Sequence, residues 1–166
     1  MIPTVFIHDR YWEYLDTTMR QAEKYNGDVI LISNLSAPNH NCLLLKDYSV
    51  GVNEFNKNFV NMSSNGAWFE GACFSRWLIL REYMIKNDVP VTFHLDSDVL
   101  MYANIEKEYE KFRQYPITLV VGNCGATSFV TLPFIDGFAE FILRTYRDRD
   151  SVFKELERIY SELQRQ

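Results

Sequence analysis

The chain has 166 residues, of which 47% are hydrophobic and 15% aromatic, and its formal net charge is -5 at pH 7. This length and apolar content predict one packed globular domain and exclude a disordered chain. The acidic balance argues against broad binding to nucleic acid, which needs a basic surface, but it allows an anionic small ligand that a metal ion or arginines neutralise.

Cysteine usage and hydropathy bear on the compartment. Cys42, Cys73 and Cys124 are odd in number and far apart, which indicates reduced thiols. No apolar run reaches the length of a transmembrane segment. We therefore expect a cytoplasmic protein, unless a longer parent chain carries a membrane anchor and places the domain in the lumen of the Golgi or the endoplasmic reticulum.

The first part of the chain predicts a β-α-β unit. Residues 4–8 and 28–33 are short apolar runs rich in β-branched side chains, and each predicts a buried strand. Between them, residues 11–25 space Trp12, Leu15, Met19 and Ala22 as on one helical face, with Asp9 placed to cap that helix. Such units build parallel sheets.

The middle of the chain predicts a short strand at 42–45, a weak helix at 52–60 and a long helix at 67–87. Arg76 lies in the middle of the apolar stripe of the long helix. A guanidinium there must find an anion, because it stays charged in proteins. It either pairs with a carboxylate of the protein while its stem covers apolar surface, or it faces a ligand.

Residues 91–100 predict the central strand, and two carboxylates follow where it should end. Asp96 and Asp98 would point the same way if the strand continued, because strand side chains alternate with period two. Two such charges repel unless a cation or strong donors lie between them. The pair is therefore either a divalent-metal site or a turn in which backbone N–H groups satisfy both carboxylates.

The rest of the chain continues the alternation of helices and strands. Residues 105–112 predict a helix and residues 117–121 a further strand. Residues 122–126 predict a loop at the carboxyl end of that strand, where open parallel sheets bind ligands. Residues 134–145 and 152–163 predict the last two helices.

This order of elements, with Asp-x-Asp closing an apolar strand directly after a long helix, resembles nucleotide-sugar glycosyltransferases of the GT-A fold. The resemblance is carried by residues 93–100 (FHLDSDVL) and 70–77 (EGACFSRW), and it covers roughly residues 3–146. It implies a Rossmann-like three-layer α/β sandwich with a mainly parallel central sheet. Residues 1–166 would form a single donor-binding domain whose acceptor portion is short or missing.

The resemblance also implies a reaction, the transfer of a sugar from a UDP-sugar or related donor to a hydroxyl acceptor on a glycan, lipid or protein. The departing diphosphate gains negative charge, which Mn²⁺ or Mg²⁺ on hard oxygen ligands stabilises. Asp98 would be the primary metal ligand and Asp96 the supporting one. Arg76 would reach the diphosphate, and Ser97 would join the donor contacts.

Further donor contacts follow from the same resemblance. His8, Asp9 and Asn34, at the ends of the first two strands, would face the base and the ribose. A third metal ligand has no candidate, and the catalytic base is unassigned. Asp136 is one option for the base, although a carboxylate in the first turn of a helix usually just complements the helix dipole.

Two other functions remain open. In a haloacid-dehalogenase-like phosphohydrolase, a strand-end Asp-x-Asp supplies an aspartyl nucleophile and a general acid, and a lysine and a second acidic pair lie on later strand ends. A non-catalytic domain that binds a nucleotide sugar is the third possibility, which the short length favours and the two aspartates disfavour. The length also suits a short family member, a truncated chain or a module completed by another chain.

Overall fold

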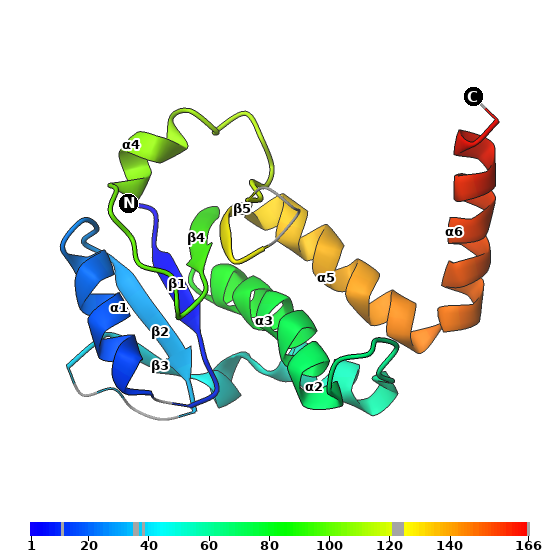
Figure 1. The fold of residues 1–166 in the computed structure, drawn as a ribbon, viewed down its shortest axis with the longest axis horizontal. Helices are drawn as coiled ribbons and strands as arrows, with labels where there is room; N and C mark the ends of the chain where they lie inside the picture. Colours follow the sequence, from blue (N-terminus) through cyan, green and yellow to red (C-terminus); the bar gives the residue numbers. More distant parts are fainter. Residues whose placement is uncertain (11, 35–36, 38, 121–124, 166) are drawn as a thin grey trace.

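The computed structural model describes residues 1–10, 12–34, 37, 39–120 and 125–165. Within these ranges the chain forms one sheet with helices on both faces (Figure 1). The strands are β1 (Thr4–Ile7), β2 (Val29–Ser33), β3 (Cys42–Leu44), β4 (Val91–Leu95) and β5 (Thr127–Thr131). The helices are α1 (Glu13–Glu23), α2 (Val50–Asn58), α3 (Ala67–Lys86), α4 (Ile105–Tyr109), α5 (Leu132–Arg147) and α6 (Arg149–Leu163), with a 3-10 helix, η1 (Leu45–Tyr48), before α2.

The sheet has the order β3-β2-β1-β4-β5 and is mainly parallel, as predicted. Strand β1 pairs in parallel with β2 on one side and β4 on the other, and β3 extends the parallel part beyond β2. Strand β5 runs antiparallel to β4. The sheet therefore grows in one direction from β1 to β3 and in the other from β1 to β5. The crevice beyond the carboxyl ends of strands at such a reversal is where open α/β sheets bind ligands.

Alternating side chains give the sheet two apolar faces, so the fold has three layers. Along β1, Val5 and Phe6 are both fully buried but belong to different apolar clusters. The cluster on the α1 and α4 side includes Phe6, Met19, Ala22, Leu31, Phe93, Leu95 and Ile105. The cluster on the α3 and α5 side includes Val5, Ile32, Leu80, Met84, Val130 and Ile135. Burial of these side chains from water is the main force that holds the helices to the sheet.

Helix α2 packs on the outer side of α3 and α5 rather than on the sheet. Phe55 of α2 is buried against Leu78 of α3 and Ile142 of α5. The N-terminus of α2 is fixed to α3 by a buried carboxylate, because Glu82 accepts hydrogen bonds from the backbone N–H groups of Val50 and Gly51. These contacts place the N-terminus of α2 beside the last turns of α3.

The predicted strand at 117–121 is wrong within the residues that the structure describes. Ile117 forms an isolated antiparallel bridge with Val130, and Val120 is likewise a single bridge residue, so residues 117–120 form no strand, while residue 121 lies outside the described ranges. The edge of β4 is instead taken by β5, in which Phe129 and Val130 are buried on opposite faces. Leu119 and Val120 remain exposed, so they gain no packing from a strand.

The predicted loop at 122–126 falls partly outside the described residues. Gly125 and Ala126 form a turn that leads into β5 instead of following a parallel strand. Because β5 is antiparallel, this turn still lies at the edge of the sheet where β1 and β4 end.

Helix α6 extends away from the sheet and rests on α5 near its first turn (Figure 1). Val152 is buried there, whereas Phe153, Leu156, Ile159, Tyr160 and Leu163 are exposed. Within the described ranges, none of the helices is both long and apolar enough to cross a membrane.

Candidate functional site

A cavity of about 620 Å³ opens where β1, β2 and β4 end, and this volume is typical of small-molecule sites. Its described lining contains all of the residues predicted to bind donor or metal: His8, Asp9, Asn34, Arg76, Asp96, Ser97 and Asp98. Asp136, the option for the catalytic base, pairs instead with Arg81 and is not part of this lining. The apolar part of the lining comes mainly from η1, α2 and α3 and includes Leu45, Val52, Phe59, Trp68, Phe69 and Ile79. The fold thus brings together side chains that lie up to ninety positions apart in the sequence.

The two aspartates reach the cavity through a turn and not through a continued strand. Strand β4 ends at Leu95, the amide of Asp96 donates to the carbonyl of Ala126 (2.7 Å), and the amide of Val99 donates back to the carbonyl of Asp96 (3.1 Å). Asp98 lies inside this turn and is exposed. No backbone amide among the described residues donates to either carboxylate, so this turn does not satisfy the pair in the way that the non-functional alternative requires.

Asp96 forms an ion pair with Arg76 of α3, and both side chains line the cavity. It points to α3 because it continues the alternation of β4, in which His94 also faces that helix. Arg76 additionally donates from Nε to the carbonyl of Cys73 (3.3 Å), one turn earlier in α3. The structure therefore gives Arg76 the protein carboxylate that one sequence alternative required, at a place where the guanidinium also lines the cavity.

Burial raises the pKa of the Asp96 carboxyl, and the charge of Asp98 adds to this effect, while Arg76 opposes it. The two carboxylates are thus coupled, as their spacing predicted. Asp96 remains ionised most easily while a cation lies next to it.

His94 is a site residue that the sequence argument did not assign. Its side chain is 1% exposed, and Nδ1 donates to the carbonyl of Val5 (3.1 Å). Nε2 lies 3.7 Å from Oδ1 of Asp96 and has no hydrogen-bond partner among the described residues. Burial, and secondarily the charge of Arg76, lowers the pKa of His94 to about 4. The ring is therefore neutral near pH 7 and does not balance the charge of Asp96.

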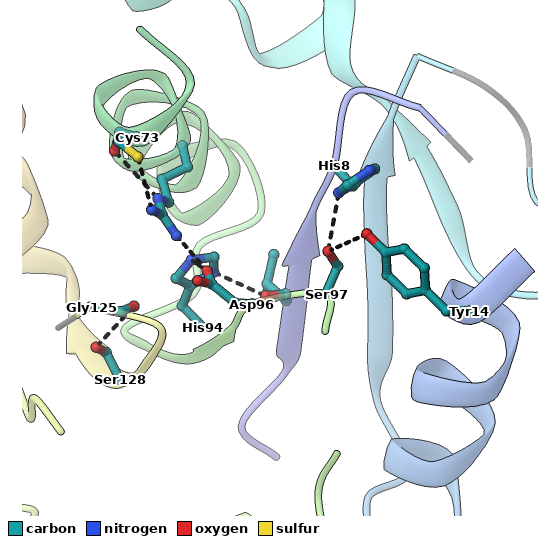
Figure 2. A network of polar contacts seen from close by, with 10 residues as sticks. His8, Tyr14, Cys73, His94, Asp96, Ser97, Gly125 and Ser128 are labelled. Atoms are coloured by element: carbon teal, nitrogen blue, oxygen red, sulfur yellow. Dashed lines mark hydrogen bonds and ion pairs between the residues drawn. The ribbon is translucent and has the colours of Figure 1, made fainter. Parts of the chain in front are cut away.

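A second polar group lies at the end of β1, where Ser97 joins two other side chains (Figure 2). Its Oγ is 3.1 Å from Nδ1 of His8 and 3.4 Å from the hydroxyl of Tyr14. Burial lowers the pKa of His8, although Asp9 and Asp98 partly oppose the shift. Nε2 of His8 is buried without a hydrogen-bond partner in the described structure. Tyr14 was not predicted, but its place in the first turn of the helix after β1 is a signal that could have identified it.

The remaining predicted residues lie at the rim. Asn34 follows β2 and is exposed, and Asp9 follows β1 and accepts from Nε of Arg10 (3.3 Å). The predicted helix cap at Asp9 is wrong, because α1 begins at Glu13 after Trp12, and no side chain caps it. Trp12 is also 52% exposed instead of lying on the buried face, since it precedes the first helical turn.

The charge and chemistry of the lining suit a hard divalent cation. Three carboxylates, those of Asp9, Asp96 and Asp98, face a single arginine among the described lining residues, which include no lysine. In the described part of the chain, no three or more His, Cys, Asp or Glu side chains are arranged so that they alone could hold a metal ion. Mg²⁺ and similar ions are commonly held by one or two carboxylates, with phosphates and waters completing the shell, and Asp96 and Asp98 fit that arrangement.

No family model matches the chain, and comparisons with curated proteins and with solved structures also found no match. A functional assignment must therefore come from the chemistry of the cavity.

Proposed function

We propose that this chain is a metal-dependent glycosyltransferase domain of the GT-A type, which transfers a sugar from a nucleoside-diphosphate donor, UDP-sugar first, to a hydroxyl acceptor. The observation that carries the proposal is the position of the Asp96–Asp98 pair. It lies at the reversal point of the sheet, inside a cavity of ligand size, and faces an arginine.

The electrostatics favour a diphosphate that arrives with a cation. A polyanion alone would be repelled by three carboxylates that one guanidinium cannot neutralise. Mn²⁺ or Mg²⁺, when bound, would supply positive charge to the departing diphosphate. Asp98 is exposed and carries no ion pair in the described structure, so it is the side chain best placed to hold the cation, with Asp96 in support.

The other cavity side chains would bind and orient the donor. Arg76 would hold the diphosphate through charge-assisted hydrogen bonds. His8, Ser97 and Tyr14 form a neutral polar group that suits the hydroxyls of a ribose. Asp9 and Asn34 at the rim would contact the base or the ribose, as the resemblance implies.

The proposal is tested by the thermal stability of the protein with Mn²⁺, with UDP and with both. A ligand that binds only the folded state raises Tm, and we expect the largest rise when both are present. Asp98→Asn should remove most of that rise. Asp136→Asn is the matched control, because Asp136 pairs with Arg81 and does not line the cavity. No shift with any nucleotide and metal, or an unchanged shift in Asp98→Asn, would contradict the proposal.

Neither alternative is favoured by a specific observation. A phosphohydrolase would use Asp96 as a free nucleophile, but Arg76 holds this carboxylate, and the described cavity lining contains no lysine. An assay with a generic aryl phosphate separates this activity from glycosyl transfer. A non-catalytic binding domain would show the same Tm shift. Hydrolysis of the donor separates the two functions, because a glycosyltransferase should slowly hydrolyse a UDP-sugar with Mn²⁺ and no acceptor, whereas a binding domain should leave it intact.

A further inference from the structure

The side chain that would support the cation is already neutralised by the protein. Asp96 pairs with Arg76, and both side chains are largely shielded from water, with exposed fractions of 30% and 24%. Arg76 is the only arginine or lysine in the described lining of the cavity. A cation and this guanidinium therefore seek the same carboxylate.

We propose that Arg76 competes with the cation for Asp96, so that cation and diphosphate bind cooperatively. The cation gains Asp96 when the diphosphate takes over Arg76. This inference rests on the proposed function and adds to it a coupling between the two ligands of the site.

The surroundings of Asp96 offer no substitute for Arg76 within the described structure. His94 donates through Nδ1 to the carbonyl of Val5, and its Nε2 lies 3.7 Å from Oδ1 of Asp96, which is beyond hydrogen-bond distance. If Arg76 leaves, Asp96 keeps a half-buried charge without a partner, and this state is unfavourable. A cation that arrives at the same time removes that penalty.

Arg76 can change partners without disturbing the core. Nε donates to the carbonyl of Cys73 and Nη2 lies 3.4 Å from its Sγ, so the guanidinium is held at the cavity by its own helix. Cys73, Arg76 and Asp96 all line the cavity. A diphosphate in the cavity would therefore meet the guanidinium after a small side-chain rotation.

Thermodynamic linkage makes the coupling measurable in either direction. If UDP raises the affinity for Mn²⁺ by some factor, Mn²⁺ raises the affinity for UDP by the same factor, and couplings of this kind are commonly about 5- to 150-fold. Removal of the competing charge should strengthen the binding of Mn²⁺ alone and reduce the coupling to the part that direct contact between cation and diphosphate supplies. A residue that merely supports the fold would not produce this opposite pair of effects.

The experiment is a Mn²⁺ titration of the full chain, with free Mn²⁺ followed by electron paramagnetic resonance, without UDP and with saturating UDP. In the wild type we expect weak binding that UDP strengthens at least about fivefold. In Arg76→Gln, Mn²⁺ alone should bind several-fold tighter than in the wild type, and UDP should strengthen it by a clearly smaller factor than in the wild type. Arg76→Lys keeps the charge and should retain part of the coupling. Arg81→Gln is the matched control from the same helix, because Arg81 pairs with Asp136 outside the cavity lining, and it should behave as the wild type.

The outcomes separate the two proposals. Cation and nucleotide binding that is independent in the wild type, or Mn²⁺ affinity that is unchanged or weaker in both Arg76 variants, overturns the competition and leaves the proposed function standing. No Mn²⁺ binding in the wild type, with or without UDP, contradicts the proposed function itself.

Discussion

At the scale of single residues, His94 shows how the site is built into the core. Its ring packs edge-on against Trp77 of α3, with 5.5 Å between the ring centroids, and donates to the backbone of β1. Its neutral form is compatible with this burial, whereas the charged form would lie beside Arg76 without solvent.

This burial predicts a pH dependence of stability. The pKa of His94 is about 4 in the folded chain and near 6.5 when unfolded, so the unfolded state binds a proton first. The contribution of His94 is fully present above pH 6.5 and is lost as the pH falls toward 4, by up to about 3 kcal/mol. In urea denaturation, the free energy of unfolding of the wild type should fall more steeply between pH 7 and 4.5 than that of His94→Asn. The asparagine retains a donor for the carbonyl of Val5 but does not titrate. Parallel pH profiles of the two proteins would contradict this prediction.

At the scale of elements, the turn before β5 depends on a close approach to α3. A Cβ added at Gly125 would lie 2.5 Å from Cζ2 of Trp77, and that ring is confined between His94 and Phe138. Only a residue without a side chain lets this turn reach the hydrogen bond between Ala126 and Asp96 that ends β4.

Two alanine substitutions should therefore shift stability in opposite directions. Gly125→Ala should lower the free energy of unfolding by about 1–3 kcal/mol, because the overpacked ring must move. Gly137→Ala, at an exposed position of α5 with no atom within 4 Å of the added Cβ, should raise it by about 0.5–1 kcal/mol. Chemical denaturation measures both, and a neutral Gly125→Ala would show that the turn does not approach Trp77 closely in solution.

The elements also show what the sequence could and could not predict. Apolar content was sufficient to place α3 and β4, but the predicted apolar stripe of α3 was wrong, because residues 78–80 are buried in succession while Phe69 is exposed. Strand β4 is buried on both of its faces. Apolar content could not choose between residues 117–121 and 127–131, because both are short β-branched runs and pairing with β4 decides which one becomes a strand. The antiparallel direction of β5 is a tertiary outcome of the same kind.

The candidate site was predictable to a similar extent. All seven residues predicted to bind donor or metal line one cavity, because parallel strands bring their carboxyl ends to one edge. The partner of Arg76 was not predictable, since it depends on which side chains of α3 face the alternating residues of β4. His94 and Tyr14 were not predicted as site residues. The sequence around His94 indicates only a buried strand, and that around Tyr14 indicates only a helix.

At the scale of the whole molecule, α6 is the part least integrated into the fold. Along its apolar stripe, Val152 is buried, while Leu156, Ile159 and Leu163 are exposed. An ion pair between Arg144 and Glu155 (3.4 Å) adds little at an exposed position.

Hydrogen exchange should show this difference directly. Regions with few buried apolar contacts open locally at low free energy, so amides of α6 should exchange much faster than those of α5 in the same protein. Protection of α6 equal to that of α5 would contradict the prediction and would mean that its apolar stripe is covered in solution.

The proposed function depends on one claim, that the acidic pair at the carboxyl ends of β1 and β4 binds a cation that neutralises a diphosphate. Crystals grown with Mn²⁺ and UDP test it through the anomalous signal of manganese. The account predicts a peak within about 2.0–2.6 Å of a carboxylate oxygen of Asp98, the range of hard-cation contacts with oxygen, and a diphosphate in contact with Arg76. A map without a manganese peak in the cavity, with Arg76 still on Asp96 and UDP absent or bound elsewhere, would contradict it.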